Sequence, residues 1–187
     1  MAMPKRGRLL RFFFAVLGAL VVAIAGFVLW LWWPDANKLS VYAAQGDLTG
    51  IRWSIRLGVD PNEPSRWGWY HENLGQTALT TAAATGQVAA VRLLIAEGAD
   101  PDLLDADGRS QTPLSTAAMH GQLEVCRELL KAGADPNIPT TPHERRAPGG
   151  WTALDWALQA EHKEVADLLR KHGAVEGRRR LRKDIDD

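Results

Sequence analysis

The chain has 187 residues with 22 basic and 22 acidic side chains, so its formal net charge is zero. Residues 1–33 contain four basic residues and no acidic one, which leaves 18 basic and 22 acidic side chains in the rest of the chain. That mildly acidic balance is not typical of nucleic-acid binding, and we predict no nucleic-acid partner. A single cysteine excludes an intramolecular disulfide and any CxxC metal or redox motif.

Residues 1–11 form a basic N-terminus, and residues 12–33 follow with 22 residues that carry no charge and no polar side chain. As a helix, this run would extend about 33 Å, enough to cross the hydrocarbon core of a bilayer. The basic residues precede it, so the positive-inside rule places the N-terminus in the cytosol and the later chain on the outer side. We therefore predict a single-pass signal anchor.

Cleavage of this segment is the alternative, because residues 23–25, AIA, have the small-x-small form of a signal-peptidase site. It would release the rest of the chain as a secreted protein. The apolar run continues through residues 27–33 and is longer than an ordinary signal-peptide core, which favours the anchor. Ala15, Ala19 and Ala23 form a small-xxx-small stripe that could pair two spans as a weak dimer, although ordinary membrane helices also contain such residues.

Residues 112–137 contain two short helical patterns between two turn signals. Thr112 is a predicted N-cap, because its hydroxyl can accept a bond from an unpaired backbone N–H. Pro113 takes the first helical position, where its missing N–H costs nothing. Gly121 ends this helix with a positive φ. The apolar stripe of the second helix includes Cys126, which we predict to be a core residue.

The same unit recurs in residues 37–62, 75–102, 110–137 and 150–176. These segments resemble ankyrin repeats, whose hallmarks are a T-P-L-H-x-A helix start and a G-A-D-x-N turn. The resemblance implies an all-α solenoid of about four helix-turn-helix repeats in residues 37–176, preceded by the transmembrane helix and followed by a charged tail in residues 177–187. It also implies a protein-binding scaffold or inhibitor without enzymatic activity.

The copies depart from the family pattern in several places. Asn37 takes the predicted N-cap place of the first copy, whereas Leu158 and Glu161 replace an alanine and a glycine in the last copy. The family histidine that helps to tie adjacent repeats together is replaced throughout, by Ser40, Thr80, Ser115 and Asp155. We therefore expect weaker coupling between repeats.

Two connections between repeats are longer than the family spacing. Fifteen residues separate Asn62 from Thr77 and Asn137 from Thr152, where the family has eight. Insertions in solenoids often lie on the binding face, and Trp, Tyr and Arg are frequent hot-spot residues. The candidates are Arg66, Trp67, Trp69, Tyr70 and His71 in the first insertion, and His143, Arg145 and Arg146 in the second. Alternatively, the aromatic residues fold back and cover the neighbouring repeat.

The resemblance implies further partner contacts from residues just before each N-cap threonine and from residues that end each first helix. They are Leu74, Gln76, Ala84, Thr85, Met119, His120, Trp151, Gln159 and Ala160. His71 and His120 are expected to approach each other across the concave side of the array.

We find no catalytic constellation. His143 and Glu144 begin an HExxH pattern, but Ala147 stands where the second zinc ligand would be. We predict no cofactor and no metal, and a metal-binding accessory enzyme is the weakest alternative. A cytosol-facing adaptor and a structural protein that self-associates through its span remain alternatives. The GADPN turn and the signal-anchor layout are typical of a bacterial protein, whose repeats would be periplasmic.

Overall fold

The computed structural model describes residues 21, 36–65, 75–106, 110–140 and 150–177. The chain divides into two units, residues 1–33 and residues 34–187. The described residues other than Val21 belong to the second unit, so the predicted span at residues 12–33 lies almost entirely outside the description. Within the described ranges, no helix is long and apolar enough to cross a membrane.

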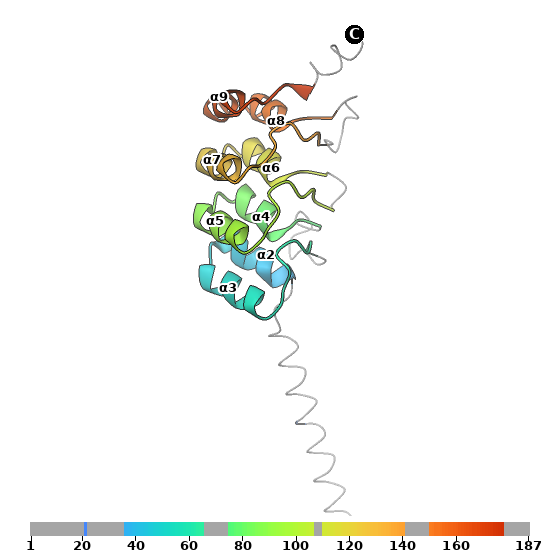
Figure 1. Cartoon of the computed structure of the whole chain (residues 1–187), viewed down its shortest axis with the longest axis vertical. Coiled ribbons are helices and arrows are strands. Elements are labelled where there is room, and N and C mark those ends of the chain that lie inside the picture. The colour runs from blue at the N-terminus through green and yellow to red at the C-terminus, as the bar shows by residue number, and fades with distance from the viewer. Residues whose placement is uncertain (1–20, 22–35, 66–74, 107–109, 141–149, 178–187) are drawn as a thin grey trace, which may run out of the picture. The chain divides into compact units, whose positions relative to one another are not determined.

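The described part of the second unit consists of four helix pairs in two columns (Figure 1). The first helices of the pairs are α2 (Ala36–Gln45), α4 (Ala78–Ala84), α6 (Pro113–Met119) and α8 (Ala153–Gln159). The second helices are α3 (Leu48–Arg56), α5 (Val88–Ala96), α7 (Leu123–Lys131) and α9 (Lys163–Lys171). Each helix packs on its counterpart in the next pair. The predicted all-α solenoid is confirmed.

The turn signals in the sequence explain where the first helices begin and end. Thr112 is the N-cap of α6, and its hydroxyl accepts a bond from the Ser115 N–H at 3.1 Å, as predicted. Gly121 follows α6 with a φ of 71°, in the left-handed region that glycine tolerates best. Glu161 holds the equivalent place after α8 with a φ of 60°. A non-glycine residue there costs about 1 kcal/mol, a strain that only the last repeat carries among these helix ends.

The predicted N-cap role of Asn37 is wrong, because α2 already begins at Ala36. This helix has 10 residues, whereas α4, α6 and α8 have seven each. Asn37 therefore has a helical backbone, whereas an N-cap such as Thr112 has an extended one.

Small residues allow the first helices to approach one another closely. Ala82 and Ala83 of α4 and Ala117 and Ala118 of α6 are fully buried between neighbouring helices. Alanine loses no side-chain rotamer entropy on burial, so it fills a narrow space at little cost. Cys126 belongs to the same core, and burial raises the pKa of its thiol to about 12. The thiol is therefore protonated at neutral pH, and the prediction that it is a core residue is confirmed.

Asparagine side chains connect the turn of one repeat to the turn of the next. The Asn62 amide donates to the Gly98 carbonyl at 3.1 Å and accepts from the Asp100 N–H at 2.8 Å. Asn137 makes the same two contacts with the last turn, at 3.1 and 2.8 Å. An amide side chain is suited to this place because it can donate and accept at the same time.

Asp102 fills the equivalent place between the second and third turns. Its carboxylate accepts from the Asp135 N–H at 2.9 Å, but an ionised carboxylate cannot donate to the turn carbonyl. Partial burial raises the pKa of the Asp102 carboxyl, and the nearby Asp100 and Asp135 carboxylates add to the shift, while the bond from the Asp135 N–H opposes it. Because the folded-state pKa lies above the unfolded one, ionisation of this group lowers stability as the pH rises.

We expect Asp102→Asn to raise the free energy of unfolding by about 1 kcal/mol, because the amide restores the missing donor and removes the charge. Urea unfolding of the full chain in a mild detergent measures this change. The matched control is Asn137→Asp, the reverse exchange one repeat later, which should lower stability by a similar amount. Equal stability of the parent chain and the Asp102→Asn variant would contradict this explanation of the turns.

Candidate functional site

Each loop between repeats is closed by a backbone hydrogen bond to the residue before the next N-cap threonine. The bonded pairs are Ser65 with Gln76, Asp105 with Gln111, and Thr140 with Trp151, with N···O distances of 2.9, 2.9 and 2.7 Å. Both members of every pair are buried. These pairs fix where each loop leaves the stack of helices.

In the sequence, the predicted loop residues stand between the two members of a closing pair. Nine of them fall outside the described residues: Arg66, Trp67, Trp69, Tyr70, His71, Leu74, His143, Arg145 and Arg146. Their role in binding a partner therefore stays a prediction, as does the approach of His71 to His120.

Gln76 and Trp151 are different, because the structure buries both of them. Each side chain is only 6% exposed, which leaves almost no surface for a partner. The ring of Trp151 packs against Trp156 of α8 with 4.8 Å between the ring centroids. The Trp156 indole N–H in turn donates to the Thr140 hydroxyl at 2.8 Å. The residue before the N-cap belongs to the base of the loop and not to its tip, so we leave both residues out of the candidate surface.

Residues that replace the family histidine still connect the first helices to neighbouring loops. Thr80 donates from its hydroxyl to the Asp105 carboxylate at 2.8 Å, and the Thr77 N–H donates to the same oxygen at 3.2 Å. In the last repeat, the Asp155 carboxylate accepts from the Gly177 N–H at 2.8 Å. Thr80 and Asp155 thus supply a cross-connection of another chemical type, and the expected loss of coupling remains untested.

The two inner first helices, α4 and α6, leave free surface only at their C-terminal ends. In α4 residues 78–83 are all buried, and in α6 residues 113–118 are all buried. In these two helices exposure begins with the last residue and continues at the residue that caps it, whereas the outer helices α2 and α8 also expose Val41 and Leu158. Because the repeats stack in register, these ends form a row, which we call the helix-end column. Its residues are Ala44, Gln45, Ala84, Thr85, Met119, His120, Gln159 and Ala160.

The column contains both predicted and missed residues. The sequence analysis named its members from the second, third and fourth repeats, but it omitted Ala44 and Gln45 from the first. Their alignment with Ala84 and Thr85 relative to the following glycine was the signal that would have found them. The first copy matches the repeat pattern less well, with Asn37 in place of the threonine, so its helix end is harder to align from the sequence alone.

Side chains from the next repeat hold the column in place. The Gln87 amide donates to the Ala44 carbonyl at 3.3 Å, and the Gln122 amide donates to the Ala84 carbonyl at 3.3 Å. Each glutamine lies directly over a helix-ending glycine: a Cβ atom built on Gly86 would come within 2.5 Å of the Gln122 side-chain oxygen. The close approach and the positive φ together require glycine there. The helix ends are therefore fixed before a partner arrives.

His162 takes the place of these glutamines in the fourth repeat. Its ring lies over Gly121, where an added Cβ would be 2.7 Å from the imidazole. Partial burial, helped by the nearby His162, lowers the pKa of His120, so the His120 ring is neutral at pH 7. A neutral imidazole presents one donor and one acceptor. No group of three or more metal-ligating side chains occurs in the part of the chain that the structure describes.

The chemistry of the column suits polar recognition. Gln45, His120 and Gln159 each offer a donor and an acceptor. The Thr85 hydroxyl donates to the Thr81 carbonyl at 3.0 Å and still offers an acceptor. Met119 adds a partly exposed, flexible apolar side chain beside them, and methionine adapts to differently shaped surfaces. Such a mixture can form hydrogen bonds and a small apolar contact without the desolvation cost of buried charges.

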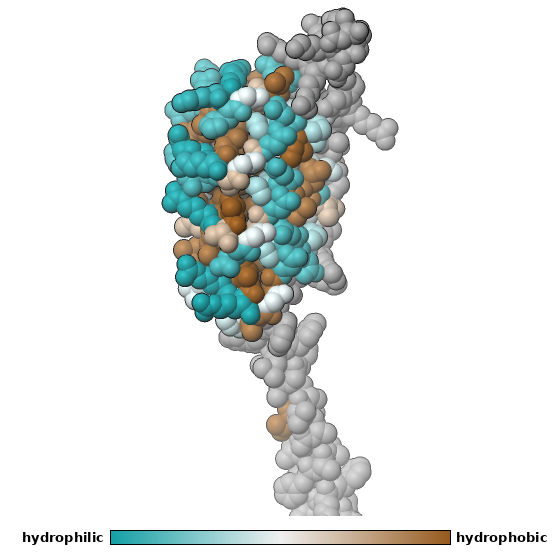
Figure 2. Space-filling view, viewed as in Figure 1, coloured by the Kyte–Doolittle hydropathy of each residue, from teal (hydrophilic) through white to brown (hydrophobic). Residues whose placement is uncertain are grey.

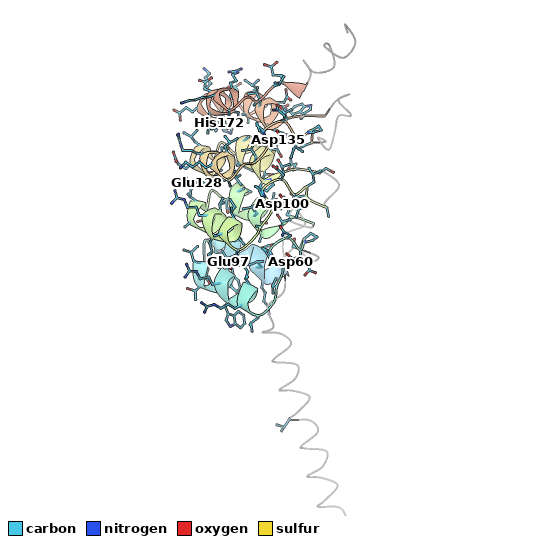
Figure 3. The ribbon with its side chains drawn as sticks, in the orientation of Figure 1. Asp60, Glu97, Asp100, Glu128, Asp135 and His172 are labelled. Atoms are coloured by element: carbon cyan, nitrogen blue, oxygen red, sulfur yellow. The ribbon has the colours of Figure 1, made fainter. Side chains whose placement is uncertain are left out.

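Charged residues gather instead on the second helices and the turns, where hydrophilic side chains cover most of the outer edge (Figure 2). Asp60, Asp100 and Asp135 lie one above another at successive turns (Figure 3), and each accepts from the N–H two residues later at 2.8 to 2.9 Å. These bonds shape the turns locally. The row of carboxylates therefore has a structural explanation.

Glu128 of α7, on the same outer edge, has a strongly lowered pKa. Its carboxylate accepts from the Arg92 side chain of the preceding repeat at 2.9 Å and from Lys131 at 2.8 Å. These two partners lower the pKa of Glu128 to about 2, and the side chain is only 13% exposed. The ion pair with Arg92 bridges the second and third repeats, so we assign Glu128 to stability.

We expect Glu128→Gln to lower the melting temperature of the full chain at pH 7, because the bridge to Arg92 loses its charge. The carboxyl titrates near 4.5 when unperturbed and near 2 in the fold, so the parent chain loses this advantage as the pH falls between those values. Melting curves at pH 7 and at pH 3 should therefore show a smaller difference at the lower pH.

Glu124→Gln is the matched control, since Glu124 makes a solvent-exposed ion pair with Arg127 at 3.4 Å within the same helix. Such a pair contributes little, so this variant should melt close to the parent chain at both pH values. A difference for Glu128→Gln that stays constant down to pH 3 would show that the carboxylate is not the source of the effect.

Comparison with known families agrees with this architecture. A family model described as ankyrin repeats (3 copies) matches residues 39–140, which is more than half of the chain. A second model, described as ankyrin repeats (many copies), matches residues 114–170. No curated protein matches the chain.

Proposed function

Because the chain belongs to the ankyrin-repeat family, we propose that it is a non-enzymatic scaffold or inhibitor that binds another protein through its helix-end column. The resemblance seen in the sequence is confirmed by the family models. Ankyrin repeats imply a protein-interaction role, but the identity of the partner is not encoded in the repeat pattern.

One observation supports the column as the binding surface. Stacking buries almost every residue of α4 and α6, and the side chains that it leaves accessible are aligned at the helix ends. The backbone of the helix ends at Ala44 and Ala84 is held by Gln87 and Gln122, so it loses little conformational freedom on binding, which favours affinity. The loop residues predicted from the sequence remain further candidates for contact with the partner.

Photo-crosslinking tests this surface directly. We expect a photoreactive amino acid at Met119 of the full chain to form one discrete crosslinked protein species in the native host cell. The same probe at Ala132, an exposed residue that caps α7 in the same repeat, is the matched control and should give none. Equal crosslinking from both residues, or crosslinking from Ala132 alone, would place the partner elsewhere.

We also propose that residues 12–33 anchor the protein in the membrane, with the N-terminus in the cytosol and the repeats on the outer side, in the periplasm of a bacterium. This proposal is supported by the 22-residue apolar run and by the basic residues before it. A cytosol-facing adaptor is the alternative that would reverse the orientation.

Reporter fusions at the C-terminus distinguish the orientations. A reporter that is active only outside the cytosol should be active in the membrane fraction, and a reporter that is active only inside should be silent. Activity of the inside reporter would favour the cytosol-facing adaptor. Outside activity in the soluble fraction would indicate cleavage near residues 23–25.

A further inference from the structure

The two ends of the helix stack differ in the residues that they expose. Helices α2 and α3 form one end, and α8 and α9 form the other (Figure 1). The exposed residues of α9 are all charged: Lys163, Glu164, Asp167, Arg170 and Lys171. At the opposite end, α3 and its C-cap expose Trp53 at 43% and Leu57 at 45%, with Arg56 between them. A terminal repeat needs a charged or polar outer surface in water, which α9 has and α3 lacks at Trp53 and Leu57. The last repeat exposes apolar side chains only outside α9 among the described residues, at Leu158 (39%) and Val175 (42%).

Comparison with an inner repeat indicates which way Trp53 faces. Counted from the glycine that ends each second helix, Trp53 is equivalent to Glu128, and Glu128 bonds to Arg92 of the preceding repeat. This place on the helix therefore faces the preceding neighbour. No repeat precedes α2 in the sequence, so Trp53 lies where a further repeat would otherwise stack.

Trp53, Arg56 and Leu57 share one side of the helix, because residues three and four apart are neighbours on a helical surface. We call these three residues the end face. Neither α3 nor its C-cap contains an acidic residue, and Arg52 is a second exposed base on the helix. Tryptophan favours the headgroup layer of a bilayer, and arginine binds lipid phosphate with several donors.

The first repeat follows the predicted anchor directly in the sequence. Only two residues, 34 and 35, separate the end of the apolar run from the start of α2. The connection can extend over about 10 Å at most, so α2 begins within about 10 Å of the end of the apolar run. The first repeat is thus the one that a membrane-bound chain must carry at the lipid surface.

We propose that the end face lies on an anionic lipid surface, with Trp53 and Leu57 in the headgroup layer and Arg56 bound to lipid phosphate. This inference rests on the proposed membrane anchor. It would fix the direction in which the repeats leave the bilayer and thereby orient the helix-end column toward its partner.

Site-specific quenching tests the contact in the full chain reconstituted into vesicles of phosphatidylcholine and phosphatidylglycerol. The native thiol is first removed with Cys126→Ala. Alanine suits this place because Ala166 occupies the equivalent position in α9. An environment-sensitive fluorophore is then attached through Leu57→Cys. The matched controls carry the label through Glu97→Cys or His172→Cys, which are the equivalent places in the second and fourth repeats.

With a nitroxide on the lipid headgroups, the label at position 57 should lose at least half of its fluorescence, while the labels at positions 97 and 172 lose little. Adding Trp53→Glu or Arg56→Glu should restore fluorescence at position 57. Both residues are exposed, so the melting temperature of each variant should stay close to that of the parent chain. Two such variants keep the test valid if one of them fails to fold.

Flotation of the vesicles separates the two proposals. If the chain floats with the lipid but the three labels are quenched alike, the end-face contact is wrong and the anchor stands. If position 57 of one copy crosslinks to position 57 of another, self-association covers the end face and the lipid contact is also wrong. If the chain does not float, the anchor fails, and the contact that rests on it fails as well.

Discussion

The close packing of the first helices through alanine determines the rest of this structure. Ala82, Ala83, Ala117 and Ala118 are buried completely, so consecutive first helices approach without large side chains between them. Larger residues there would force the helices apart and create strain or voids. The consequence for function is direct, because packing of this kind uses the sides of the inner first helices, α4 and α6, and leaves only their ends for contact with another molecule.

Polar contacts then fix the register of the stack. Glutamines from the next repeat bind the carbonyls at the helix ends, and asparagines bind from turn to turn. Each contact joins segments more than 30 residues apart, so the stack depends on neighbouring repeats and not on any single one. The same contacts hold the helix-end column rigid, which links the stability of the fold to its proposed use as a binding surface.

Much of this fold could be predicted from the sequence, because the signals are local. Thr112, Pro113 and Gly121 determine a helix and its ends by backbone chemistry alone, and the recurrence of the unit implies stacking. The burial of Trp151 could not be predicted in the same way. An aromatic residue beside a long loop can face solvent or the stack, and only the pairing of Thr140 with Trp151 settles it. The start of α2 before Asn37 likewise could not be predicted, because asparagine is accepted both at an N-cap and inside a first turn.

The central claim is that stacking leaves the helix-end column as the surface for a protein partner. The most direct measurement is a structure of the full chain bound to the partner that the cell supplies. The account predicts that the partner contacts Thr85, Met119, His120 and Gln159 and leaves the outer surface of α5 and α7 open to solvent. A partner seated on α5 and α7, with the helix-end column free, would contradict it.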